Sequence, residues 1–199
     1  MVLQDVTLDN IKRVFDNKGY TLEQNDFKLT FVGIRSKTRL IDNWDDFFAI
    51  CWTEEGKGKI WTTGDYTTDP GIHYMQKKLL NPLGCGIMAP GYYKGLWREG
   101  VHAGKYVAFK QIGQVSIYRD RNLDNYMDMN PETLQSSNSY GANLHHGYAS
   151  SRVNNNSALC QVLRYPRDLQ LALAKYQKHK SLYGELVDYC LLHEEDFVI

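Results

Sequence analysis

The sequence has no surplus of charge of either sign, because 23 Lys and Arg residues balance 23 Asp and Glu residues. A neutral chain has no long-range field that gathers phosphates, so nucleic acid is not expected as a partner. No apolar run approaches the roughly 20 residues that a membrane-spanning helix needs. Residues 1–6 contain no basic segment before an apolar one, and we therefore expect a soluble protein, made in the cytoplasm without a signal peptide.

Cysteine is also scarce, and its wide spacing excludes a dense disulfide framework and a paired C-x-x-C zinc site. The four residues are Cys51, Cys85, Cys160 and Cys190. We expect Cys51, Cys85 and Cys190 to be small, buried apolar side chains.

The chain can bury one ordinary core, since 43% of its 199 residues are hydrophobic. We predict a single domain over residues 1–199, in which 1–45 form a helix and strand extension and 46–199 form the core. Apolar spacing predicts helices over Thr7–Lys18 and Asp168–Leu182. Alternating apolar residues predict strands over Phe27–Arg35, Phe47–Thr53, Lys59–Thr63, Tyr106–Lys110, Gln114–Arg119, Ala142–His146 and Leu186–Leu192. This pattern indicates a mainly β fold with a helix near each end.

Two pairs of these strands are close enough in sequence to form hairpins. Phe47–Thr53 and Lys59–Thr63 flank a polar turn that contains glycine, and the strands before and after Ile112-Gly113 form the second pair. Residues 65–104 are interrupted repeatedly by proline and glycine, so short strands and turns are expected there. The polar segment 122–140 is predicted to be a surface loop.

Two histidines and a cysteine lie within one short segment, Gly141–Val162. An imidazole that lowers the pKa of a thiol produces a nucleophilic thiolate. Side chains alternate between the two faces of a strand, so only one of His145 and His146 can face Cys160. The polar run Ser150–Asn156 is long enough to carry the chain out and back, which places Cys160 beside the histidine strand.

Neighbours of the cysteine are candidates for assisting it. Ser157 is expected to hydrogen-bond either the local turn or a substrate carbonyl, and the backbone N–H groups of Leu159 and Cys160 are candidates for binding an oxyanion. The residues alone leave an alternative open, in which Cys160 is a core residue between Leu159 and Val162 and both histidines are structural.

The segment resembles the active-site pattern of the L,D-transpeptidases, in which His-Gly is followed, after a spacer, by Ser-x-Gly-Cys. Here His146-Gly147 or His145 stands for the histidine, Ser157 for the serine and Cys160 for the nucleophile. Members of that family are all-β cysteine enzymes that cut and rejoin peptidoglycan stem peptides. The resemblance therefore implies a β-sandwich or barrel with short flanking helices, an acyl-enzyme on Cys160 and no cofactor.

Most of the chain, from about Phe47 to Phe197, is also similar to a group of bacteriophage-encoded proteins that are themselves similar to L,D-transpeptidases. The matching landmarks are Thr67–Gly71, Ala89–Tyr93, Val101–Tyr106, Tyr118–Asp120, Asn143–His145 and Ser157–Val162. In that group the histidine of an Asn-x-His triplet is the matching one, which favours His145 over His146. Leu159 departs from the pattern, because glycine is expected there and leucine does not easily adopt the unusual backbone dihedrals that glycine permits.

The resemblance implies a hydrolase or transferase that processes peptidoglycan, with a stem peptide as its partner. A phage product of this kind would be carried in the virion or released to the cell wall, and self-association is left open. The alternative is a structural or cell-wall-binding phage protein that keeps the fold, in which Leu159 has weakened or abolished turnover.

Further candidate residues lie outside the histidine and cysteine segment. Arg119 is expected to pair with a substrate carboxylate bidentately, and His102 stands in a glycine-flanked loop that can approach the active site. For both residues, a turn position or a surface ion pair is the alternative interpretation. Leu159 completes the predicted substrate-binding set.

A polar stretch has part of the spacing of a calcium loop. Asp120, Asn122, Asp124 and Asp128 stand at relative positions 1, 3, 5 and 9. Neither a glycine at position 6 nor an acid at position 12 is present, so a solvated polar loop is favoured and no metal site is predicted.

Overall fold

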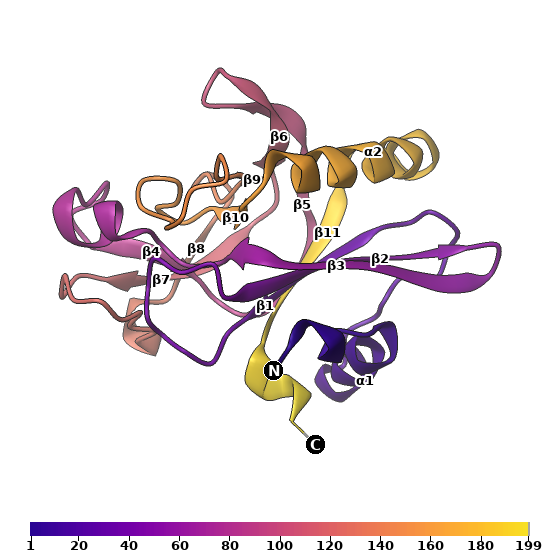
Figure 1. The fold of residues 1–199 in the computed structure, drawn as a ribbon, viewed down its shortest axis with the longest axis horizontal. Helices are drawn as coiled ribbons and strands as arrows, with labels where there is room; N and C mark the ends of the chain where they lie inside the picture. The colour runs from indigo at the N-terminus through magenta and orange to yellow at the C-terminus, as the bar shows by residue number, and fades with distance from the viewer. Residues whose placement is uncertain (199) are drawn as a thin grey trace.

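Two β-sheets form the framework of the protein, whose computed structural model describes residues 1–198. The strands are β1 (Thr30–Arg35), β2 (Asp46–Glu54), β3 (Lys57–Thr67), β4 (Cys85–Met88), β5 (Gly91–His102), β6 (Tyr106–Gln111), β7 (Val115–Asp120), β8 (Gln135–Ser137), β9 (Leu144–His146), β10 (Gln161–Leu163) and β11 (Val187–His193). The larger sheet is mixed and closes on itself, with eight strands in the order β1-β11-β5-β6-β9-β10-β3-β2 (Figure 1). The smaller sheet has three strands in the order β4-β7-β8. The predicted mainly β fold is confirmed, and Ile199, the last residue of the predicted domain, lies outside the described residues.

Helix α1 (Leu8–Lys18) confirms the helix predicted near the N-terminus. Thr7 caps it, because the Thr7 side chain accepts a hydrogen bond from the Asn10 N–H. Gly19 ends it in the left-handed conformation, with a φ of 68°. The buried side chains of α1 are Ile11, Val14 and Phe15, and they pack on the outer face of the closed sheet.

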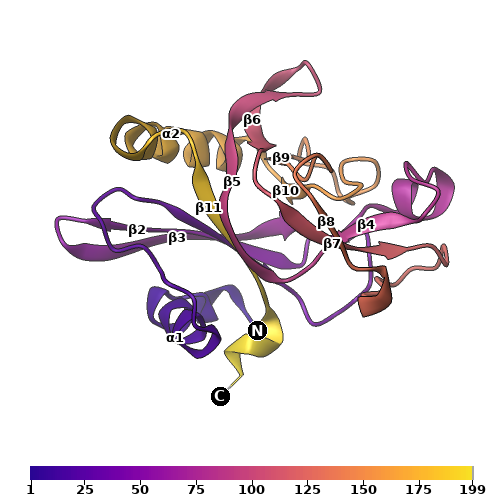
Figure 2. The same cartoon turned by 180° about the vertical axis from the view of Figure 1, so that it is seen from behind.

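Helix α2 (Pro166–Tyr183) confirms the second predicted helix but begins at Pro166 rather than Asp168, since proline is favoured in the first turn of a helix. Leu169, Ala172 and Tyr176 of α2 join the main core inside the closed sheet. Figure 2 shows from behind that α1 and α2 lie on opposite sides of that sheet. None of the described helices combines the length and apolarity needed to cross a bilayer.

Four short helical turns complete the described secondary structure, and they are η1 (Leu3–Asp5), η2 (His73–Lys77), η3 (Pro131–Thr133) and η4 (Glu194–Phe197). The polar segment 122–140 is therefore not entirely a loop, because it contains η3 and β8 and its Met127 side chain is fully buried. Within 65–104, β4 is short as predicted, whereas β5 extends over 12 residues.

The first predicted hairpin is confirmed as β2 and β3, and both strands are longer than predicted. Glu54 pairs with Lys57, so the turn consists of Glu55 and Gly56, whose φ angles are 52° and 71°. Positive φ at both turn residues gives a twist that matches the twist of the flanking strands.

Strand β1 is buried on both faces, which is why its residues do not alternate between buried and exposed. Phe31 belongs to the main core, whereas Val32 and Ile34 pack with α1. The strand begins at Thr30 rather than at the predicted Phe27, because Phe27 has a left-handed φ of 61° and cannot extend it.

The second predicted hairpin is wrong, although both of its strands exist. Strand β6 pairs with β5 and β9 in the closed sheet, whereas β7 pairs with β4 and β8 in the small sheet. The chain changes sheets at Ile112 and Gly113, whose N–H groups both donate to the Leu96 carbonyl, at 2.8 Å and 3.0 Å. The Gln111 side chain holds this corner by donating to the carbonyls of Gly113 and Ser137, at 3.0 Å and 2.9 Å. A turn anchored to a neighbouring strand in this way does not close a hairpin.

Strands β9 and β10 run parallel, with His145 opposite Val162. The connection over residues 147–160 returns the chain to the start of β10, where the Gln161 N–H donates to the Asn143 carbonyl at 2.9 Å. Cys160 therefore lies beside the histidine strand, as the length of the polar run predicted. The other three cysteines, Cys51, Cys85 and Cys190, are buried and unpaired in the described chain, also as predicted.

Candidate active site

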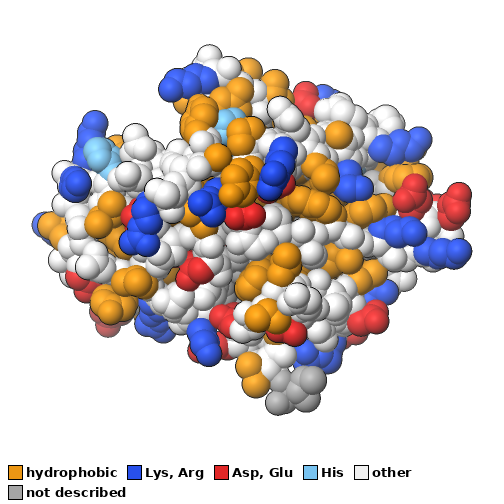
Figure 3. All heavy atoms as spheres, viewed as in Figure 1, with side chains coloured by type: hydrophobic (Ala, Val, Ile, Leu, Met, Phe, Trp, Pro, Cys, Tyr) orange, Lys and Arg blue, Asp and Glu red, His pale blue; other side chains and the backbone are white. Residues whose placement is uncertain are grey.

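Cys160 and His145 line the same cavity, which has a volume of about 490 Å³. Tyr74 lines it from η2, and His102, Lys105 and Tyr106 line it from the β5–β6 arm, the two strands that project from the closed sheet (Figure 1). In the space-filling view the molecule is hollowed beside this arm, and Lys and Arg side chains stand on either side of the hollow (Figure 3).

Cys160 is positioned through the residue that follows it. The Gln161 side-chain oxygen accepts hydrogen bonds from the hydroxyls of Tyr66, at 3.0 Å, and Tyr189, at 2.7 Å, in the main core. The two hydroxyls are also 3.0 Å apart. Buried polar groups that satisfy one another in this way specify one arrangement, so Gln161 and the start of β10 are fixed from inside the closed sheet.

The connection before Cys160 is fixed by a buried carboxylate. Asp42 accepts hydrogen bonds from the N–H groups of Ile72 and Asn154 and forms an ion pair with Arg152. Gly71 lies so close to this loop that an added Cβ would stand 1.8 Å from the Asn154 carbonyl oxygen. Only glycine fits there, and its N–H donates to the Ser157 carbonyl at 2.8 Å.

The hydrogen bonds of His145 define its tautomer. Nδ1 lies 3.0 Å from the His146 carbonyl oxygen, which can only accept, so Nδ1 carries the proton. The Tyr106 hydroxyl lies 3.3 Å from the same nitrogen and donates to the same carbonyl at 3.2 Å. Nε2 therefore holds the free lone pair of the ring, and this nitrogen is buried without a hydrogen-bond partner among the described residues.

Two other histidines, His102 and His146, lie close to His145 but differ from it in orientation. His102 stacks on it with ring centroids 4.1 Å apart, and the Asn143 amide nitrogen lies 3.5 Å from His102 Nδ1. His146 points to the opposite face of β9, where its ring stacks on Tyr106 at 4.1 Å and its Nδ1 accepts from the Tyr148 N–H. His145 is the histidine that lines the cavity with Cys160, and His146 does not line it.

Burial keeps this pair of groups neutral. It lowers the pKa of His145 to about 3, an effect that nearby His102 strengthens and that the backbone at His146 and Asn156 opposes. Cys160 is half-buried as a residue, yet enough protein surrounds its sulfur that burial raises its pKa to about 11, against smaller lowering effects of the Asn143 backbone and Lys110. The resting site thus favours a neutral thiol and a neutral imidazole, and not the thiolate that the sequence suggested.

Alkylation of Cys160 by iodoacetamide at pH 7 is expected to be roughly 100-fold slower than alkylation of free cysteine, because the thiolate is the reacting form. The rate should keep rising with pH above the pKa of free cysteine. Mass spectrometry of the Cys160 peptide measures it, and protein unfolded in urea is the control that should react like free cysteine. A folded-state rate at pH 7 that matches free cysteine would show that the site holds a thiolate.

The side chains of Ser157 and Leu159 make contacts that stabilise the fold. The Ser157 hydroxyl is buried and donates to the Cys160 carbonyl at 2.9 Å, so it serves the local turn. Leu159 packs in the main core against Gly86, and its φ is not in the left-handed region. The N–H groups of Leu159 and Cys160 donate no hydrogen bond in the described part of the chain, so the fold itself does not use them.

Arg119 lies in a neighbouring cavity of about 250 Å³, which Leu159 also lines. The residues with calcium-loop spacing bind one another through hydrogen bonds. Asp120 accepts from the N–H groups of Asn122 and Asp128, and the Asn122 amide donates to Asp124 and Asp128, at 3.0 Å and 2.8 Å. Within residues 1–198, no three His, Cys, Asp or Glu side chains converge as metal ligands would.

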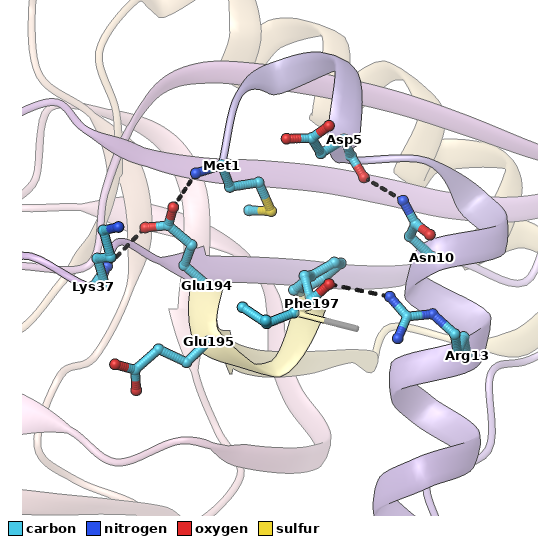
Figure 4. A pocket seen from close by; sticks show the side chains of 9 residues that line it. Met1, Asp5, Asn10, Arg13, Lys37, Glu194, Glu195 and Phe197 are labelled. Atoms are coloured by element: carbon cyan, nitrogen blue, oxygen red, sulfur yellow. Dashed lines mark hydrogen bonds and ion pairs between the residues drawn. The ribbon is translucent and has the colours of Figure 1, made fainter.

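A further cavity of about 340 Å³ lies between α1 and η4, and Met1 is one of the residues that line it (Figure 4). Its polar groups already bind one another, since the Met1 ammonium pairs with Glu194 and the Arg13 guanidinium donates to the Phe197 carbonyl at 3.2 Å. No histidine or cysteine of the described chain lines this cavity, so it does not compete with the Cys160 cavity as a reaction site.

Two residues of the site, Tyr106 and Lys110, were not predicted from the sequence, whereas Asn143 was identified only as the first residue of the Asn-x-His triplet. A signal for Tyr106 was present, because His102 and Tyr106 flank a glycine turn and pair across the β5–β6 arm. The position of Lys110 depends on strand pairing and carried no such signal.

No family model matches this chain, and neither a curated protein nor a solved structure matches it.

Proposed function

We propose that this chain is a cysteine peptidase or transpeptidase of the L,D-transpeptidase type, encoded by a bacteriophage, that acts on peptidoglycan stem peptides. The observation that carries the chemistry is that Cys160 and His145 line one cavity, and that His145 Nε2 has no hydrogen-bond partner among the described residues. The substrate class and the finer fold assignment rest on the motifs that resemble that family.

The reaction starts from the neutral pair. His145 Nε2 takes the thiol proton as the Cys160 sulfur attacks the scissile carbonyl, and the N–H groups of Leu159 and Cys160 are the nearest candidates to bind the resulting oxyanion. The carbon–nitrogen bond then breaks, the proton passes from His145 to the leaving amine, and the acyl group remains on sulfur as a thioester. Water releases it in hydrolysis, and a second amine releases it in cross-linking.

Incubation with purified sacculi is the direct test. The native chain is expected to change the muropeptide profile, whereas Cys160→Ala is expected to leave it identical to that of untreated sacculi, because the variant has no nucleophile. Liquid chromatography with mass spectrometry identifies which muropeptides gain or lose a peptide bond. Identical profiles for the native chain and Cys160→Ala would reject the enzymatic proposal.

A second function is favoured by two observations, the raised pKa of the Cys160 thiol and the leucine that precedes it. In this second function the chain is a cell-wall-binding or virion structural protein, and the Cys160 cavity binds a ligand without turnover. Pelleting with sacculi distinguishes it, because binding that persists with no change in muropeptides supports this second function alone.

A further inference from the structure

The cavity of Cys160 and the cavity of Arg119 are neighbours that share part of their walls. Tyr74, Leu80 and Ala158 line both of them. The turn before β10 runs between the two, since Leu159 lines one cavity and Cys160 the other. A ligand that reaches Cys160 therefore has an adjoining space beside Arg119.

One donor of the Arg119 guanidinium is free among the described residues. Nη1 donates to the Gly84 carbonyl at 3.2 Å, and the guanidinium carbon lies 5.3 Å from the centre of the Tyr140 ring. Nε is buried away from the cavity, and no atom of Arg119 forms an ion pair within the described residues. Nη2 is neither buried nor hydrogen-bonded, so it is the donor that a carboxylate in this cavity can reach.

The charged side chains that line the two cavities are all basic, although Asp120 pairs with Cys85 behind the wall of the Arg119 cavity. Lys105 lines the Cys160 cavity, and Lys110 is near enough to lower the pKa of the Cys160 thiol. No Asp or Glu of the described chain lines either cavity. Because the whole chain carries no net charge, this excess of positive charge is a local property of the groove.

We propose that Arg119 forms a subsite for a free carboxylate, so that the groove selects acidic peptides over their amidated forms. This inference rests on the proposed function only for the chemistry at Cys160, and the carboxylate subsite itself needs no turnover. The Gly84 carbonyl and the Tyr140 ring contact the guanidinium, and the carboxylate of the ligand supplies the acceptor that Nη2 lacks.

Binding to the inactive Cys160→Ala protein tests the subsite separately from catalysis. The probes are two forms of one N-acetylated dipeptide that ends in D-alanine, one with a free carboxylate and one with a C-terminal amide. Calorimetric titration is expected to show about tenfold tighter binding of the acid. Equal affinity for the two probes would overturn the proposal, whatever the sacculus assay shows.

Substitution at Arg119 then assigns the preference to this side chain. When Arg119→Gln is combined with Cys160→Ala, the preference for the acid should vanish. Arg119→Lys in the same background should restore only part of it, because lysine keeps the positive charge but lacks the planar guanidinium. The matched control is Arg98→Gln, since Arg98 is exposed, pairs with Glu185 and lines neither cavity. A preference that survives in Arg119→Gln, or that Arg98→Gln removes, would assign the selectivity elsewhere.

Discussion

Replacing His145 with alanine is expected to lower the turnover of stem peptides by roughly 100- to 10,000-fold, the range that a general base contributes. The reason lies in the resting state, because a thiol whose pKa is about 11 has few thiolate molecules at neutral pH and depends on a base during attack. His145 lines the cavity with Cys160, and its Nε2 has no hydrogen-bond partner among the described residues, so it is the candidate base. Release of new muropeptides per unit time, at saturating sacculi, measures the effect.

The matched control is His146→Ala, because His146 is the next residue and points to the opposite face of β9. Its substitution removes a ring stacked on Tyr106 and should lower the rate far less than His145→Ala. In the native chain, the pKa of His145 at about 3 keeps the base unprotonated in mild acid, so turnover should not fall as pH drops below the usual histidine range. Equal losses in both alanine variants would contradict the assignment of His145.

Replacing Gly33 with alanine is expected to destabilise the protein by about 3 kcal/mol, near the upper end of the range for overpacking a core. A Cβ at this position would stand 2.1 Å from the Tyr189 hydroxyl and 3.1 Å from the Tyr66 hydroxyl. These are the hydroxyls that hold Gln161, so the start of β10 would have to move as well. Thermal unfolding should show a midpoint lower by roughly 6–12 °C.

Two further variants separate the steric cause from a general intolerance of side chains at glycine positions. Gly64→Ala adds the same methyl group in β3, where the nearest neighbour would be the Phe47 ring at 3.6 Å, an ordinary contact, and it should change stability little. Adding Tyr189→Phe to Gly33→Ala removes the closest oxygen and should restore part of the loss. If Gly33→Ala were as stable as Gly64→Ala, the Tyr189 and Tyr66 side chains would have to make room for the methyl group at little cost in free energy.

The parts of the structure that local pattern controls could be predicted from the sequence. The spacing of Ile11, Val14 and Phe15 and the cap at Thr7 identify α1, and a glycine turn identifies the hairpin of β2 and β3. The length of the polar run before Ser157 was enough to bring Cys160 back beside β9.

The parts that depend on distant residues could not be predicted. Strand β7 joins the small sheet because Gln111 and the Leu96 carbonyl fix the corner before it, and neither contact leaves a mark in the local sequence. The pKa values of Cys160 and His145 likewise depend on burial by residues distant in sequence, and that of His145 also depends on His102, which stacks on it. A histidine and a cysteine close in sequence indicate a shared site, but their charge states follow from what covers them.

The neutral state of Cys160 and His145 also affects how well the thiol resists oxidation. Peroxide and other oxidants attack thiolates, so a sulfur that stays protonated until a peptide arrives is slow to become a sulfenic acid. Under the proposed function, a protein outside a reducing compartment would keep its thiol intact through the same burial that makes its reaction depend on His145.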